Sequence, residues 1–104
     1  MKTTLTFFFA FFLAFTLFSQ PVRNEILTPS IPGYEVLKCD FHMHTVFSDG
    51  SVWPDVRVGE AWQDGLDAIA ITDHLEYNPH RDYIPVNHSA PYALAEKTAA
   101  DVGL

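Results

Sequence analysis

The sequence contains very little cysteine and few basic side chains. Its single cysteine, Cys39, excludes an internal disulfide framework and a cysteine-rich zinc finger. Thirteen acidic side chains against six basic ones give a net charge of −7. This balance argues against a basic nucleic-acid-binding surface and against an anionic membrane partner.

The longest hydrophobic run lies at the N-terminus. Lys2 precedes residues 5–18, in which only two threonines are polar. At about 14 residues, this run is shorter than the roughly 18–20 that a membrane-spanning helix needs. The small residue Ser19 then offers a cleavage site, so the pattern predicts a signal peptide, residues 1–19, and an exported, periplasmic or extracellular protein. No membrane anchor is expected after cleavage; an uncleaved anchor helix is the alternative.

The remaining residues show an alternation of strand and helix signals. Residues 20–33 contain three prolines and no apolar period, which predicts a linker or extended arm. A short β-compatible segment at 34–42 precedes a helix that we expect from Pro54 to Gly65. Residues 66–72 form a near-continuous apolar run, typical of a parallel strand buried on both faces. Ser89 is expected to cap a second helix that ends at Gly103.

The predicted order is therefore strand, helix, strand, helix, which indicates the α/β class. Repeated βα units build parallel sheets or barrels, and two parallel strands cannot close a core. Leu104 lies where a third strand is expected to begin. We therefore expect residues 34–104 to be the incomplete N-terminal part of a larger domain.

Three polar features lie at or just beyond the ends of the two predicted strands. His42 and His44 are two residues apart on an extended segment, so both imidazoles can reach one metal ion. Asp49, in the turn that follows, can supply a carboxylate oxygen. Asp73 and His74 end the apolar strand, where a carboxylate needs a polar partner. Active sites of α/β folds lie at this edge, and the set predicts a site for Zn, Mn or Fe.

Each feature by itself also has a simpler interpretation. A histidine pair two residues apart can arise by chance, and an aspartate before glycine is often only a turn residue. Asp73 and His74 are equally compatible with capping the segment that follows the strand. Glu76 fits either the support of a ligand or an ordinary loop position. His80 and His88 match no motif and are expected at the surface.

The motifs resemble a known family. The run DFHMHTVFSDGS at residues 40–51 and the run ITDH at residues 71–74 are similar to the two N-terminal motifs of the PHP (polymerase and histidinol phosphatase) domain superfamily. The leader and the run LKCDFHMH at residues 37–44 resemble a secreted bacterial branch, the Sb-PDE-type phosphodiesterases.

The resemblance implies a distorted (β/α)7 barrel, of which this chain would supply the first two βα units. It also implies two or three divalent metal ions that hydrolyse phosphoesters. By position, His42 and His44 would bind the first ion, while Asp49 and His74 would bind a neighbouring one. Asp49 and Asp73 would have catalytic roles, Asp73 as a ligand or as a partner that orients an imidazole. The remaining ligands of the family have no counterpart here, so the chain alone is expected to be inactive.

The leading hypothesis is an exported metal-dependent phosphoesterase that acts on a small phosphoester, with a diester favoured over a monoester. A metal-activated water would be the nucleophile. The alternatives are a phosphomonoesterase of the same fold, a non-catalytic exported metal-binding protein and an inactive gene remnant. The sequence carries no signal for an oligomeric state.

Overall fold

The computed structural model describes residues 21–104, and the predicted signal peptide at 1–19 lies outside this range. The described residues form β1 (Cys39–Met43), α2 (Pro54–Gln63), β2 (Ala68–Ile71) and α3 (Ala90–Val102). None of the helices in this part of the chain is long and apolar enough to cross a membrane. The order of the four elements confirms the α/β class that the sequence predicts.

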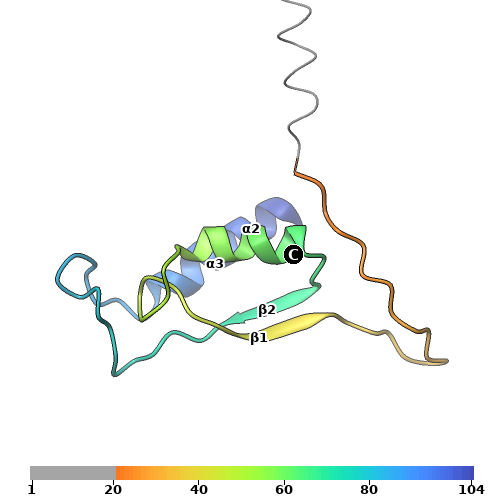
Figure 1. The fold of residues 1–104 in the computed structure, drawn as a ribbon, viewed down its shortest axis with the longest axis horizontal. Coiled ribbons are helices and arrows are strands. Elements are labelled where there is room, and N and C mark those ends of the chain that lie inside the picture. Colours follow the sequence, from red (N-terminus) through yellow and green to blue (C-terminus); the bar gives the residue numbers. More distant parts are fainter. Residues whose placement is uncertain (1–20) are drawn as a thin grey trace, which may run out of the picture.

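The two strands form a parallel sheet, and both helices lie over the same face of it (Figure 1). The paired residues are Cys39–Ala68, Asp40–Ile69 and Met43–Ile71. The register shifts between the second and third of these pairs. Because the strands run in the same direction, their carboxyl ends lie at one edge, where the loops at 44–53 and 72–89 both begin (Figure 1).

The core lies between the helices and the covered face of the sheet. Val58 and Ala61 of α2 are almost fully buried, at 0% and 1% exposure, and Ala95 of α3 is buried beside them at 8%. The expectation that the second strand is buried on both faces is wrong for the described residues. All four residues of β2 are half-buried, because the two helices cover only one face of the sheet.

The first strand is shorter at its start than the sequence predicts. It begins at Cys39 rather than at residue 34, and it extends to Met43. β2 is the strand beside it, and the backbone amides of Asp67 and Ala68 both donate to the Lys38 carbonyl at 2.7 and 3.4 Å. Within the described residues, 34–37 have no strand to pair with, so the ladder cannot extend to them.

Helix α2 begins at Pro54, as the sequence predicts, and its last helical residue is Gln63, two residues before the predicted stop at Gly65. Pro54 occupies the first turn, where its missing amide proton costs nothing. Asp64 follows the last helical residue, and Gly65 then takes a positive φ of 84°. A Cβ at Gly65 would also collide with the Asn24 carbonyl, so glycine is required by conformation and by space.

Ser89 occupies the cap position of helix α3, as predicted, but its side chain makes no capping hydrogen bond to the helix. Instead, Asn87 Oδ1 accepts hydrogen bonds from the amides of Ser89 and Ala90 at 3.2 and 3.1 Å and from the Ser89 hydroxyl at 2.9 Å. The serine hydroxyl is thereby oriented toward Asn87. At the other end, Gly103 adopts a φ of 75° and confirms the predicted stop.

Residues 21–38 contain no helix or strand and run to the start of the sheet (Figure 1). Arg23 donates to the Leu66 carbonyl at 2.8 Å and contacts the Asp67 carboxylate at 3.1 Å. Lys38 contacts the same carboxylate at 3.2 Å. The carboxylate of Asp67 thus connects both ends of this arm to the residues that lead into β2.

Candidate metal centre

Three side chains from the two strand ends meet at the carboxyl edge of the sheet. His44 follows β1, Asp49 lies in the turn beyond it, and His74 follows β2. One ligand atom from each lies within 4.8 Å of the other two. Metal–nitrogen and metal–oxygen bonds are about 2.0–2.2 Å long, so two donors of one ion lie at most roughly 4.4 Å apart. The donor set fits a divalent ion after a small adjustment of side chains.

The carboxylate of Asp49 is the centre of this group. His44 Nδ1 lies 2.6 Å from Asp49 Oδ1, and His74 Nε2 lies 3.8 Å from Asp49 Oδ2. The hydrogen bond with the His44 ring, above all, holds the pKa of the Asp49 carboxyl below its ordinary value. The carboxylate is therefore ionised at neutral pH. With 39% of its side chain exposed, it is also accessible to an ion from solvent.

His42 lies beside the three-residue group. Its ring stacks on the ring of His44 with centroids 4.9 Å apart and planes 8° apart, so the two imidazoles project to the same side. His44 also contacts His74 edge-on, with centroids 4.6 Å apart. Of the four ligands expected from the sequence, the structure brings His44, Asp49 and His74 together and leaves His42 adjacent to them.

The carboxylate of Asp73 forms hydrogen bonds with Thr45 and Ser48, which are not members of the three-residue group. Its Oδ1 accepts hydrogen bonds from the Thr45 amide at 2.6 Å and the Ser48 hydroxyl at 2.7 Å. Its Oδ2 accepts one from the Thr45 hydroxyl at 2.6 Å. Thr45 and Ser48 are both fully buried, at 0% exposure. Asp73 therefore fixes the loop after β1 to the end of β2, and this loop carries two members of the group.

The turn between Thr45 and Gly50 is tightly closed. The amides of Ser48 and Gly50 both donate to the Thr45 carbonyl, at 3.0 and 2.9 Å. A Cβ at Gly50 would collide with the backbone carbonyl of His44, so this position has room only for glycine. From α2, Arg57 Nε donates to the same His44 carbonyl at 3.2 Å. These contacts determine where His44 and Asp49 can project.

From the loop after β2, Glu76 contacts the group itself and His80 contacts the turn that carries Asp49. Glu76 Oε1 lies 3.2 Å from His74 Nδ1, which leaves Nε2 of the same ring directed to Asp49. Hydrogen bonding to its own amide, with the nearby His74, lowers the pKa of Glu76. His80 is half-buried, and its Nε2 lies 3.1 Å from the Gly50 carbonyl. His80, which the sequence analysis expects at the surface, is thus only partly exposed, and no sequence spacing indicated this contact across 30 residues.

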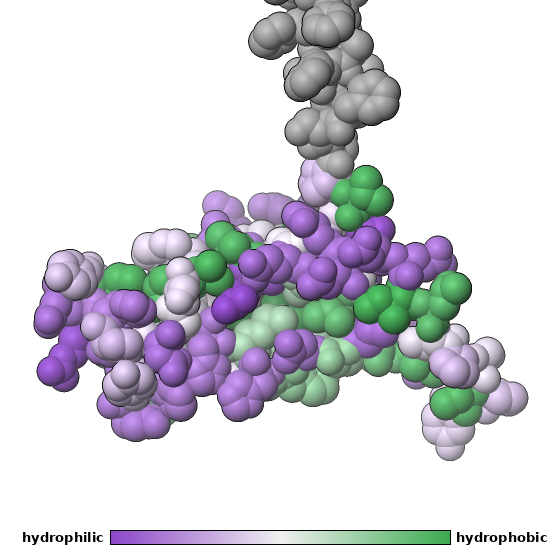
Figure 2. All heavy atoms as spheres, in the orientation of Figure 1, coloured by the Kyte–Doolittle hydropathy of each residue, from purple (hydrophilic) through white to green (hydrophobic). Residues whose placement is uncertain are grey.

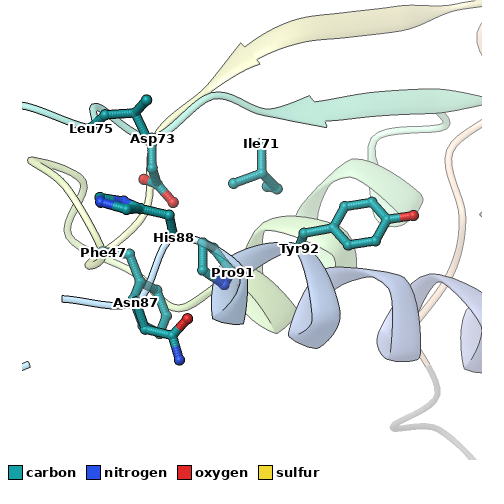
Figure 3. Close-up of a pocket in the computed structure, with 8 residues that line it drawn as sticks. All are labelled: Phe47, Ile71, Asp73, Leu75, Asn87, His88, Pro91 and Tyr92. Atoms are coloured by element: carbon teal, nitrogen blue, oxygen red, sulfur yellow. The ribbon is translucent and has the colours of Figure 1, made fainter. Parts of the chain in front are cut away.

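On the helix side of Asp73 lies a pocket of about 190 Å³. In the view of Figure 3, Asp73 and His88 lie at one end of this pocket and Tyr92 lies at the other. His88 is exposed, as the sequence predicts. The pocket is lined mostly by apolar side chains, and the Asp73 carboxylate is its one acidic group.

The fold and the group of side chains define an α/β protein with a candidate metal centre at the carboxyl edge of a parallel sheet. The PHP domain model matches residues 40–101, more than half of the chain, and the chain belongs to the PHP domain family. This confirms the family that the two sequence motifs indicate.

Two similar proteins extend the comparison. One is the crystal structure of a two-domain protein from Bacteroides vulgatus that contains a predicted PHP-like metal-dependent phosphoesterase. It is 54% identical, with a TM-score of 0.76, over 79% of this chain and 24% of that chain. The other is an uncharacterised protein of Methanocaldococcus jannaschii, 44% identical over 48 residues, 46% of this chain and 22% of the relative.

The chain spans less than a quarter of the length of either protein. Its two strands and two helices match the first βα units of a PHP-like fold, as the sequence predicts.

Proposed function

We propose that the complete protein is a metal-dependent phosphoesterase and that the group at the carboxyl edge of the sheet holds part of its metal centre. One observation carries this proposal. Ligand atoms of His44, Asp49 and His74 lie within 4.8 Å of one another. The chain that positions them is 54% identical to a protein containing a predicted PHP-like metal-dependent phosphoesterase.

The contacts of each residue indicate its role in the proposed metal centre. His44, Asp49 and His74 hold divalent ions, and His42, stacked on His44, completes the imidazole side of the centre. When bound, such ions activate a water and stabilise the charge that develops on phosphate oxygens. An acidic protein repels anionic substrates, so the centre also supplies the local positive field that a phosphoester needs.

Asp73 acts as a positioning residue in this proposal. Three donors from Thr45 and Ser48 occupy its carboxylate, which offers about four lone-pair sites in total. Its function is to keep the loop that carries His44 and Asp49 in one conformation. Glu76 has a similar role toward His74, because a carboxylate on one ring nitrogen orients the other nitrogen toward the ion.

The finer features of the proposal have their support in the sequence. The resemblance of residues 37–44 to Sb-PDE-type phosphodiesterases favours a diester over a monoester. The imidazole and carboxylate donors favour Zn, Mn or Fe. The pattern of residues 1–19 supports export, which mass determination of the N-terminus of the secreted protein would test.

The decisive experiment measures hydrolysis by the complete protein. It compares a chromogenic phosphodiester with the matching phosphomonoester, before and after chelation and after the return of Zn, Mn or Fe. We expect turnover that is lost with the chelator and restored by a metal, with the diester hydrolysed faster. Tight metal binding without turnover of either ester would contradict the proposed enzyme and would support a non-catalytic metal-binding protein instead.

A further inference from the structure

His80 is held at a fixed place in a loop that has neither helix nor strand. Its amide donates to Asn78 Oδ1 at 2.8 Å. Its carbonyl accepts hydrogen bonds from the amides of Tyr83 and Ile84, both at 2.9 Å. Both backbone polar groups of His80 are therefore bonded, and the loop presents its imidazole in a defined position.

The imidazole reaches back to the turn that carries Asp49. His80 Nε2 lies 3.1 Å from the carbonyl oxygen of Gly50. A carbonyl can only accept, so Nε2 carries the proton and donates it. The amide of Gly50 already donates to the Thr45 carbonyl at 2.9 Å. Gly50, the residue directly after Asp49, is thus fixed at both its amide and its carbonyl.

The turn itself does not depend on this contact. The hydrogen bonds to the Thr45 carbonyl close it, the Val46 amide donates to the Val52 carbonyl at 2.9 Å, and Asp73 holds the buried hydroxyls of Thr45 and Ser48. The Asp49 side chain joins this network only through a 3.3 Å hydrogen bond from the Ser48 hydroxyl, and 39% of it is exposed. The Gly50 amide belongs to the peptide that follows Asp49, and His80 restrains the carbonyl of the same residue, one peptide further along the chain.

We propose that His80 is a positioning residue for Asp49 in the metal centre, acting through its hydrogen bond to the Gly50 carbonyl. This inference rests on the proposed function, since it assigns His80 to the same centre. It also implies that Nε2 of His80 is not a metal-binding nitrogen, because its proton is committed to the carbonyl.

The test measures the affinity of the complete protein for Zn²⁺ by competition with a chromophoric chelator. His80→Leu should weaken binding about 10–100-fold, the usual loss when a group that orients a ligand is removed. His80→Gln keeps an N–H donor of similar reach and should recover most of the affinity. The melting temperature of the metal-free protein should change little in either variant, because the turn is closed without His80.

His88→Leu is the matched control, since His88 belongs to the same loop and is exposed. It should bind Zn²⁺ as the unmodified protein does. If His80→Leu melts several degrees lower, His80→Asn takes its place, because asparagine remains polar but is too short to reach Gly50.

Two results would overturn the inference and leave the proposed function intact. One is unchanged Zn²⁺ affinity in the variants that lack the hydrogen bond. The other is an equal loss in His80→Leu and His80→Gln, which would exclude the hydrogen bond as the cause. If the unmodified protein bound none of Zn, Mn or Fe, the proposed function and this inference would both be wrong.

Discussion

Asp73 contributes to the candidate site through the groups that donate to it. The donors are the Thr45 amide and the hydroxyls of Thr45 and Ser48, and both of these residues are fully buried. A buried donor that loses its acceptor costs more than the hydrogen bond itself contributes, since no water replaces the partner. The aspartate therefore stabilises the loop and the site together.

We predict that Asp73→Ala lowers the free energy of unfolding by about 2–3 kcal/mol, because it leaves buried donors unpaired. The proposed phosphoesterase activity should fall with it, since the loop carries two of the proposed metal-binding residues. Urea denaturation of the complete protein gives the measurement. Asp101→Ala, at an exposed position near the end of α3, is the control and should change stability by less than about 0.5 kcal/mol. Equal stability in the two variants would contradict the role given to Asp73.

Unlike Asp73, Asp49 should contribute mainly to metal binding and little to stability. Asp49→Ala is expected to abolish Zn²⁺ binding at the centre and to reduce turnover far more than it reduces the melting temperature. The reason is that its side chain is partly exposed and packs little. Turnover and melting temperature measured on the same preparation decide the question. Parallel losses in both would show that Asp49 is only a turn residue.

At the scale of the elements, glycine positions show where the backbone conformation permits no other residue. Gly65 ends α2 with a φ of 84°, and a Cβ there would collide with the Asn24 carbonyl. Asn24 approaches this closely because its amide donates to the Gln63 carbonyl at 2.7 Å. Gly59, in the middle of the same helix, has open space around it.

These two glycines give a matched pair of substitutions. Gly59→Ala should stabilise the protein by about 0.5–1 kcal/mol, because alanine loses less conformational entropy in a helix. Gly65→Ala should destabilise it by more than about 1 kcal/mol, through strain and through displacement of the arm. Thermal or urea unfolding of both variants measures the difference. A stabilised Gly65→Ala protein would show that the arm does not pack at this position.

At the scale of the whole molecule, polarity is unevenly distributed over the surface of the described residues. In Figure 2, hydrophilic side chains predominate over the loops at the carboxyl edge of the sheet. Large apolar side chains are also exposed, both in these loops, as Leu75 at 71%, and away from them, as Leu37 at 60% and Phe41 at 65%. The two helices cover one face of the sheet, and the described residues contribute no layer to the other (Figure 1).

The contacts of Asp67 with the arm at residues 21–38 make the stability of the molecule depend on pH. Its pKa lies below the ordinary value, first because the Lys38 amide donates to it at 2.9 Å and also because Lys38 and Arg23 are positively charged. A carboxyl whose pKa is lowered by folding stabilises the native state above its unfolded pKa of about 3.9. That contribution disappears as the pH falls through the lowered native value.

We therefore predict that Asp67→Asn destabilises the protein at pH 7 and that this difference shrinks as the pH falls below about 4. High salt should reduce the part that depends on the ion pairs. Urea denaturation of both proteins between pH 7 and pH 3 provides the comparison. A difference that grows toward acid pH would contradict the sign derived from Asp67.

Much of the fold follows from local patterns in the sequence. Pro54 and Gly65 set the limits of α2 because one lacks an amide proton and the other accepts a positive φ. The apolar run at 66–72 specifies β2, although only its middle residues pair. The start of β1 and the cap of α3 were not predictable in this way. They depend on which residues find a partner, β2 in one case and Asn87 in the other.

The sequence by itself determined the family, the α/β order and the residue types of the candidate centre, because motifs and periodicity are properties of neighbouring residues. Only the tertiary structure assigned partners. It turned Asp73 toward Thr45 and Ser48, set Glu76 against His74 and brought His80 to Gly50. The contacts of Asp73 and His80 join the segments that follow two different strands. They depend on the parallel register of β1 and β2, and no local spacing encodes the direction in which a side chain finds its partner.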